Sequence, residues 1–192
     1  RRREELKNNI TYKKYTCPTK IQYSAIPKIL EGRDILGMAS TGSGKTAAFL
    51  IPMINKGVLD PSQRFLIIEP TRELAMQIQD EFMQLARNTG LRSVLVMGGN
   101  SMGAQIGILK RDPQFVIATP GRLKDLTERK AINLLKINNV VLDEVDRMLD
   151  MGFIDDIRFI TSQLSENKQS LFFSATMNKK SEEIANTLLK RP

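Results

Sequence analysis

The 192-residue sequence contains no histidine, and Cys17 is its single cysteine. Without a pair of cysteines no disulfide framework can form, and without histidine most zinc sites are excluded. No apolar run approaches the roughly 20 residues that a membrane-spanning helix needs, and no signal peptide is recognisable. From these absences we expect an intracellular, cytoplasmic protein.

The composition is typical of a globular domain. Hydrophobic residues make up 41% and charged residues 26% of the sequence, and this length is sufficient for one α/β domain with a buried core. The net charge of +8 is concentrated at the start, because residues 1–30 carry a net charge of +6. We assign residues 1–14 to a basic N-terminal arm, which is either a solvated tail or a contact to a nucleic-acid backbone.

A phosphate-binding loop is predicted where Gly-Lys-Thr follows a short apolar run and precedes an apolar segment that can begin a helix. Gly42 and Gly44 allow the backbone N–H groups to face an anion. Lys45 is then placed to contact the β- and γ-phosphates, and the Thr46 hydroxyl suits Mg²⁺. Ala39 replaces the first glycine of the strict pattern, but the alternative of an ordinary glycine turn is disfavoured. The predicted loop residues are Ser40, Thr41, Gly42, Ser43, Gly44, Lys45 and Thr46.

Apolar runs alternate with amphipathic, helix-like segments along the chain. A continuous apolar run such as 65–68 is typical of a strand that is buried on both faces. Strands that alternate with helices form a parallel sheet covered on both sides. The predicted fold is therefore an α/β domain of three layers, with a mostly parallel β-sheet flanked by helices on both faces, over residues 15–192. The expected strands lie near 34–38, 65–68, 94–97, 115–118, 140–142 and 171–173.

Chemically distinctive residues follow the predicted strands, so they share the carboxyl edge of the sheet, where open α/β folds bind ligands. Asp143 can bind Mg²⁺, partly through water. Glu144 is then close to the γ-phosphate and can orient or deprotonate an attacking water. Ser174 and Thr176 follow the last strand, and Asp146 is a reasonable acceptor for their hydroxyl groups.

Three further turns at this edge are candidates for contacts to a sugar–phosphate chain. Helix N-termini offer free N–H groups, glycines permit close approach of the backbone, and arginines supply a bidentate cation. Such contacts follow a nucleic-acid backbone without reading its bases. Together with an ATP site they suggest a nucleic-acid motor. The candidates are Pro70, Thr71 and Arg72, then Gly98 and Gly99, then Thr119, Pro120, Gly121 and Arg122.

From about Tyr15 to its end, the sequence resembles the first RecA-like domain of a DEAD-box RNA helicase. Tyr15, Thr19 and Gln22 look like the adenine-recognition motif of that family, in which the aromatic ring stacks on the base and the amide reads its edge. The remaining motifs occur in the order of the family. The loop at 39–46 is similar to motif I, 70–75 to motif Ia, 98–99 to the glycine doublet, 119–122 to motif Ib, 143–146 to motif II and 174–176 to motif III.

The sequence departs from the family pattern in three ways. Val145 replaces the name-giving alanine of motif II, and Ser40 stands where the family usually has glutamine. Nothing resembles motifs IV to VI, which belong to a second RecA-like domain that supplies arginines to the transition state and half of the RNA surface. The resemblance therefore implies the ATP-binding half of an ATP-dependent RNA helicase, with ATP and Mg²⁺ as cofactors. Its implied partners are RNA, bound through the backbone, and a second RecA-like domain, with no membrane.

Two other functional classes remain open at this point. One is a binding module that holds nucleotide or RNA without catalysis, and the other is a DNA-directed helicase of the same superfamily. The adenine motif and the Asp-Glu-Val-Asp box favour the RNA branch, whereas only the length of the natural gene product separates an enzyme from a module. The domain has little tail sequence around its motifs, which suggests a bacterial source. For a eukaryotic protein, a nuclear location is the alternative.

Overall fold

The computed structural model describes residues 2–12, 20–39 and 44–190. Within them, six parallel strands form one sheet with the spatial order β1-β6-β5-β2-β4-β3. This arrangement confirms the predicted α/β fold. The strands are β1 (Ile35–Met38), β2 (Phe65–Ile68), β3 (Ser93–Val96), β4 (Phe115–Ala118), β5 (Asn139–Leu142) and β6 (Gln169–Ser174).

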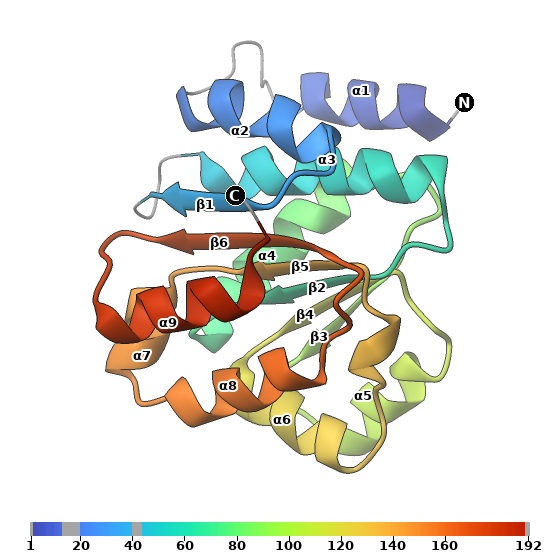
Figure 1. Ribbon diagram of the computed structural model, residues 1–192. Helices are drawn as coiled ribbons and strands as arrows, with labels where there is room; N and C mark the ends of the chain where they lie inside the picture. The colour runs from blue at the N-terminus through green and yellow to red at the C-terminus, as the bar shows by residue number, and fades with distance from the viewer. Residues whose placement is uncertain (1, 13–19, 40–43, 191–192) are drawn as a thin grey trace.

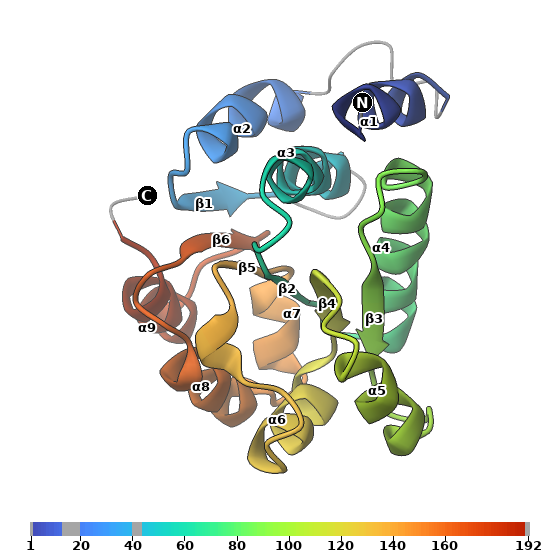
Figure 2. The ribbon, with the colours of Figure 1, turned by 90° about the vertical axis from the view of Figure 1, so that its right-hand side faces the viewer.

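Helices cover both faces of the sheet (Figures 1 and 2). In the described part of the chain, none of them combines the length and apolarity needed to cross a membrane. The helices of one face are α1 (Arg2–Tyr12), α2 (Lys20–Leu30), α3 (Lys45–Leu59) and α4 (Arg72–Leu85). Those of the other are α5 (Met102–Leu109), α6 (Pro120–Glu128), α7 (Val145–Asp150), α8 (Ile154–Gln163) and α9 (Lys179–Leu188), with the short 3₁₀ helix η1 (Leu134–Lys136).

The two faces of the sheet form two separate hydrophobic cores. Strand β2 shows how, because Phe65 and Ile67 belong to the core under α1–α4, whereas Leu66 and Ile68 belong to the opposite core. Alternate residues of a strand point to opposite faces, and all four side chains of β2 are buried. The continuous apolar runs in the sequence are therefore strands covered on both sides.

The strands end in register at one edge of the sheet. Ile68, the last residue of β2, pairs with Leu142 of β5 and with Ala118 of β4. The ladder continues one step further, since the Glu69 N–H donates to Ala118 O at 2.9 Å and the Asp143 N–H donates to Ile68 O at 3.1 Å. Residues that follow different strands are thus brought side by side.

The basic N-terminal segment forms a helix that packs on the domain. Leu6 of α1 is buried, and the Asn9 side chain donates hydrogen bonds of 2.7 Å to the carbonyl oxygens of Leu85 and Arg87 at the end of α4. Part of this segment therefore contributes to the core below α1. The domain boundary after residue 14 remains a prediction.

Two helices, α7 and α8, were not expected from the sequence. Both pack into the second core, where Val145, Met148, Ile157 and Ile160 are fully buried. Gly152 lies between them with φ of 87°, a left-handed conformation that glycine adopts without strain. Acidic and basic residues interrupt the apolar positions of this segment, which obscures its helical periodicity.

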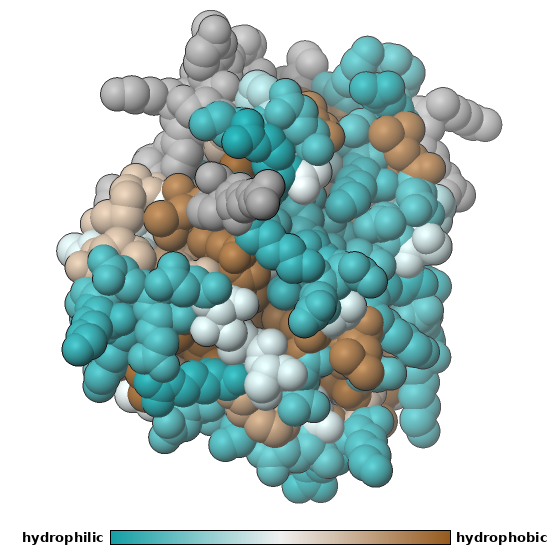
Figure 3. All heavy atoms as spheres, in the orientation of Figure 1, coloured by the Kyte–Doolittle hydropathy of each residue, from teal (hydrophilic) through white to brown (hydrophobic). Residues whose placement is uncertain are grey.

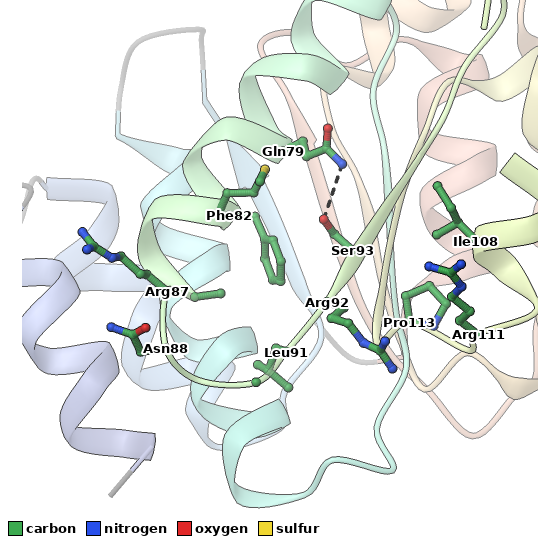
Figure 4. Close-up of a pocket in the computed structure, with 13 residues that line it drawn as sticks. Gln79, Phe82, Arg87, Asn88, Leu91, Arg92, Ser93, Ile108, Arg111 and Pro113 are labelled. Carbon is green, nitrogen blue, oxygen red and sulfur yellow. Dashed lines mark hydrogen bonds between the residues drawn. The ribbon is translucent and has the colours of Figure 1, made fainter. Parts of the chain in front are cut away.

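The surface is largely hydrophilic on the face shown in Figure 3, with apolar residues visible between the helices. Strand β1 is an edge strand, and its Leu36 and Met38 side chains are exposed. A pocket of about 490 Å³ opens elsewhere, between the end of α4 and the start of β3, with Phe82 and Leu91 in its lining (Figure 4). That pocket lies at the amino edge of the sheet, so the candidate site at the carboxyl edge does not include it.

Candidate active site

The structure describes only part of the predicted nucleotide-binding set. Tyr15, Thr19 and the loop residues 40–43 lie outside the described residues. Gln22 belongs to α2, but its side chain is not described. The geometry of the candidate site therefore begins at residues 44–46, where the loop enters α3.

Lys45 is the first residue of α3 and is nearly fully buried. Gly44 caps the helix with φ of 82°, a backbone conformation that favours glycine. The Lys45 ammonium nitrogen lies 2.8 Å from Asp143 Oδ1, an ion pair that lacks hydrogen-bond geometry, and 3.9 Å from Glu144 Oε2. Thr46 follows in the helix and is half-buried. The lysine of the loop and the two acidic residues after β5 are thus brought together.

Glu144 has an unusual backbone conformation. It caps α7 with φ of 49° and ψ of 51°, in the left-handed region that residues other than glycine rarely adopt. Such conformations cost energy and occur preferentially at functional sites. The side chain is almost buried, and its Oε1 lies 4.0 Å from Arg147 Nη1. Its carboxylate therefore sits between the Lys45 ammonium and a half-exposed arginine.

Glu69 is a third carboxylate at this position, and the sequence analysis missed it. It follows β2 directly and is 1% exposed, and within the described part of the chain no donor group forms a hydrogen bond with its carboxylate oxygens. One oxygen from each of Glu69, Asp143 and Glu144 lies within 4.8 Å of the others. Burial, and then the neighbouring Asp143 carboxylate, raise the pKa of Glu69 well above its ordinary value. An acidic residue immediately after an apolar strand was the available signal, as it was for Asp143.

Asp146 connects α7 to the end of β6. Its carboxylate Oδ2 accepts hydrogen bonds from the Thr176 hydroxyl at 3.0 Å and from the Thr176 N–H at 3.2 Å. The expected acceptor role is thus present for Thr176. The Ser174 hydroxyl bonds differently, because it accepts from the Asp146 N–H at 3.2 Å and donates to Thr176 O at 2.6 Å. These contacts join the predicted motifs II and III.

The same contacts determine the charge state of Asp146. Partial burial by itself would raise the pKa of this carboxyl group. Hydrogen bonds to the carboxylate from the Thr176 hydroxyl and from the N–H groups of Arg147 and Thr176 outweigh that effect, so the pKa of Asp146 lies below its ordinary value. Asp146 is therefore an ionised acceptor at neutral pH.

Two of the candidate turns for a sugar–phosphate chain meet at the start of α4. The Thr71 hydroxyl accepts from the Leu74 N–H at 3.2 Å, which confirms Thr71 as the N-cap of the helix. The Arg72 guanidinium group packs on Gly99, since a Cβ atom added there would lie 2.7 Å from Arg72 Nη1. Gly99 also has φ of 85°, so two separate features disfavour a side chain at that position.

The third turn is linked to the second through Gln105 of α5. The Arg122 guanidinium group donates to Asn100 O at 3.1 Å and to Gln105 Oε1 at 3.0 Å. Gln105 is buried and donates in turn to Met97 O at 2.9 Å, just before the glycine doublet. The sequence analysis missed Gln105. Its available signal was a polar residue inside the otherwise apolar helix α5.

The other residues of this set occupy the same edge. Thr119 is the N-cap residue of α6, but its side chain makes no capping bond, and Pro120 is at the first position of the helix as predicted. Pro70 is buried before α4, Gly98 is half-buried, and Gly121 is exposed.

This geometry defines a class of protein. A parallel sheet with a lysine-bearing helix N-terminus opposite an acidic strand end is the arrangement of nucleotide-binding RecA-like domains. The family model for DEAD/DEAH box helicases matches residues 19–184. The chain therefore belongs to the DEAD/DEAH box helicase family.

Individual relatives agree with this assignment. The chain is 47% identical over 178 residues to proteins described as DEAD-box ATP-dependent RNA helicase RhpA from two strains of Helicobacter pylori, B128 and 26695. The match covers 93% of this chain but only 36% of each relative. A crystal structure described as a hypothetical ATP-dependent RNA helicase from Sulfolobus tokodaii superposes with a TM-score of 0.91 and 34% sequence identity, covering 98% of this chain and 55% of that chain.

Proposed function

We propose that this chain is the N-terminal, ATP-binding RecA-like domain of an ATP-dependent RNA helicase. In the whole enzyme, RNA-stimulated ATP hydrolysis would be coupled to local unwinding of RNA or to remodelling of RNA–protein complexes. The observation that carries the proposal is the 2.8 Å contact between Lys45 and Asp143, which joins the predicted phosphate loop to the acidic strand end. The descriptions of the relatives name ATP and RNA, which supports an RNA helicase over a DNA-directed one.

In this proposal the nucleotide lies over the N-terminus of α3. Lys45 exchanges its contact with Asp143 for the β- and γ-phosphates, because a charge-assisted bond to phosphate is strong. The free N–H groups at the helix start add to the attraction for the anion. The other proposed nucleotide contacts are Tyr15, Thr19, Gln22, Ser40, Thr41, Gly42, Ser43, Gly44 and Thr46.

The residues beside the phosphates fit Mg²⁺. Asp143 Oδ1 is buried and has no hydrogen bond from the residues that the structure describes, and carboxylate and hydroxyl oxygens are the ligands that this ion prefers. Thr46 and Asp143 would hold Mg²⁺, partly through water, and the ion would neutralise charge on the phosphate oxygens. Glu144, with its carboxylate held near Lys45, accepts a proton from the attacking water.

The remaining residues serve RNA and the coupling between sites. Arg72 on Gly99 and Arg122 on Gln105 present two anchored guanidinium groups to the sugar–phosphate backbone. Asp146, bonded to Thr176, links the acidic strand end to the end of β6. Pro70, Thr71, Gly98, Thr119, Pro120, Gly121 and Ser174 complete the proposed set.

A second RecA-like domain is part of the proposal. The chain spans 36% of the length of the curated relatives, and an arginine supplied from outside a nucleotide-binding domain contributes roughly 10³–10⁵ to the rate in related enzymes. We propose that the chain described here binds nucleotide but hydrolyses it slowly. We also propose a cytoplasmic location, and the bacterial source of the relatives supports a bacterial cell.

Calorimetric titration with ADP and Mg²⁺ tests the nucleotide site of the isolated chain. We expect saturable binding, and we expect an exposed-lysine control, Lys180→Ala, to bind ADP as the unmodified chain does. Absence of binding by a folded chain would contradict the proposed function.

A further inference from the structure

Glu69 has no part in the proposed hydrolysis, yet it lies inside the proposed site. It directly follows β2, its N–H continues the ladder to Ala118, and one of its carboxylate oxygens lies within 4.8 Å of oxygens of Asp143 and Glu144. It is 1% exposed, and neither oxygen accepts a hydrogen bond from a donor group of the described residues. Buried polar atoms are nearly always satisfied in folded proteins. An unsatisfied carboxylate aimed at two others therefore indicates a missing partner.

The groups around Glu69 indicate what that partner is. Among the described residues, three carboxyl groups share this buried space with one ammonium group, that of Lys45. Arg147 reaches only the outer side of Glu144, at 4.0 Å, and its side chain is 51% exposed, so solvent screens its charge. Carboxyl groups therefore outnumber cationic groups in the described part of this cluster, and a divalent cation bound among them would offset the cost of burying carboxylates.

The ligand atoms also suit a hard divalent cation. Carboxylate oxygens bind Mg²⁺ and Mn²⁺ in preference to softer metals. One oxygen from each of the three residues lies within 4.8 Å of the others, which is close enough for one ion that keeps some of its waters. As far as the described residues go, the cluster contains carboxylate ligands and no nitrogen or sulfur ligand.

We propose that Glu69, Asp143 and Glu144 form a divalent-cation site that binds Mg²⁺ or Mn²⁺ before any nucleotide is present, with Glu69 as the third carboxylate. This inference rests on the proposed function, because it shares Asp143 with the proposed ATP site. Glu69 extends that site beyond Thr46 and Asp143 and gives the domain its own affinity for the cation. Nucleotide that draws Lys45 away from Asp143 strengthens the binding of the cation, and the coupling is reciprocal.

A different role for Glu69 makes the opposite prediction. If Glu69 serves only as a neutral carboxylic acid packed against Asp143, glutamine replaces it without loss, since the amide has the same shape and no charge. If Glu69 binds the cation, glutamine removes the negative charge that the cation needs. The variant Glu69→Gln therefore separates the two roles. Glu73→Gln, an exposed carboxylate on the first turn of α4, is the matched control.

The experiment is a titration of the nucleotide-free chain with Mn²⁺, with the unbound ion measured by its electron paramagnetic resonance signal. We expect a single site in the unmodified chain and in Glu73→Gln, and an affinity weaker by about 10–100-fold in Glu69→Gln, the loss typical of altered metal surroundings. Equal Mn²⁺ affinity in Glu69→Gln, or no site in the unmodified chain, overturns the inference.

Thermal unfolding of the same samples provides a second readout that does not depend on activity. Mn²⁺ should raise the midpoint of the unmodified chain and of Glu73→Gln, but not that of Glu69→Gln, because only a bound ligand stabilises the folded state. An equal increase in all three overturns the inference. An ADP titration of each sample distinguishes the two failures. ADP binding without a Mn²⁺ site overturns only the cation inference, whereas loss of ADP binding from the folded, unmodified chain overturns the proposed function.

Discussion

The ammonium nitrogen of Lys45 lies 2.8 Å from Asp143 Oδ1, although the two residues come from opposite halves of the sequence. Both side chains are almost completely buried, so each is the principal source of opposite charge for the other. Because the lysine must leave this pair to contact phosphate, nucleotide binding and the acidic cluster are coupled through one side chain.

The roles proposed for Lys45 and Glu144 predict different losses. Lys45→Ala should weaken nucleotide binding, because a charge-assisted contact to phosphate disappears. Glu144→Gln keeps the lysine and should weaken nucleotide binding less than Lys45→Ala does, but it should abolish hydrolysis in a two-domain enzyme, because an amide cannot act as a base. Calorimetry and phosphate release measure the two steps, with circular dichroism to check folding. If Glu144→Gln lost nucleotide as severely as Lys45→Ala, Glu144 would have a structural role instead.

The adenine motif at Tyr15 and Gln22 predicts base selectivity. Stacking on the aromatic ring and a two-point amide contact should favour adenine over guanine by about 1–3 kcal/mol, the scale of amide–adenine pairs. Parallel titrations with ADP and GDP measure this difference in the unmodified chain, and Gln22→Ala should reduce it. Equal affinities for ADP and GDP in the unmodified chain would show that Gln22 does not read the base.

Substitution of Gln105 is predicted to weaken RNA binding without changing nucleotide binding. In Gln105→Leu the Arg122 guanidinium group loses its side-chain acceptor and Met97 O loses a donor, so affinity for single-stranded RNA should fall while ADP affinity stays unchanged. Fluorescence anisotropy with a labelled RNA at low salt measures the first, and calorimetry the second. The control is Gln163→Leu, an exposed glutamine in α8. Unchanged RNA affinity in a folded Gln105→Leu chain would remove Gln105 and Arg122 from the RNA surface.

Adding a side chain at Gly37 is expected to reduce stability, because the core beside this residue is closely packed. A Cβ atom at this position of β1 would lie 2.5 Å from Cδ1 of the fully buried Phe173 ring. Gly37→Ala should therefore lower the free energy of unfolding by about 1–3 kcal/mol, the usual cost of overpacking a core. Urea denaturation measures the change. Gly107→Ala in α5 meets nothing within 4 Å and should be neutral or stabilising, so equal effects of the two substitutions would contradict this explanation.

The sheet was predictable because its strands are short apolar runs that end at conspicuous polar residues. Runs such as 65–68 carry their own signal, since burial on both faces leaves no polar alternation. Helices α7 and α8 were missed because charged residues divide their apolar positions. Helix α1 was missed for a related reason, as a strongly basic segment with few apolar residues whose Leu6 is nevertheless buried.

Within the candidate site, the sequence identified side chains by motif but not by contact. Asp143 was recognised beside Glu144, whereas Glu69 was passed over, although both Glu69 and Asp143 directly follow a buried strand. Gln105 acts by holding Arg122 in place, and a positioning residue of this kind has no motif of its own. The sequence analysis expected the Ser174 hydroxyl to donate to Asp146, whereas that hydroxyl accepts from the Asp146 N–H. The direction of this hydrogen bond depends on the orientation of the backbone, which side-chain chemistry alone does not specify.

The central claim is that this chain is the nucleotide-binding half of an RNA helicase. Phosphate release tests it most directly, measured for residues 1–192 alone and for the same residues joined to a matching second RecA-like domain, each with and without RNA. We predict slow release that RNA does not stimulate for the chain alone, and RNA-stimulated turnover for the two-domain protein. Strong RNA-stimulated turnover by residues 1–192 alone, or none by the two-domain protein, would contradict the account.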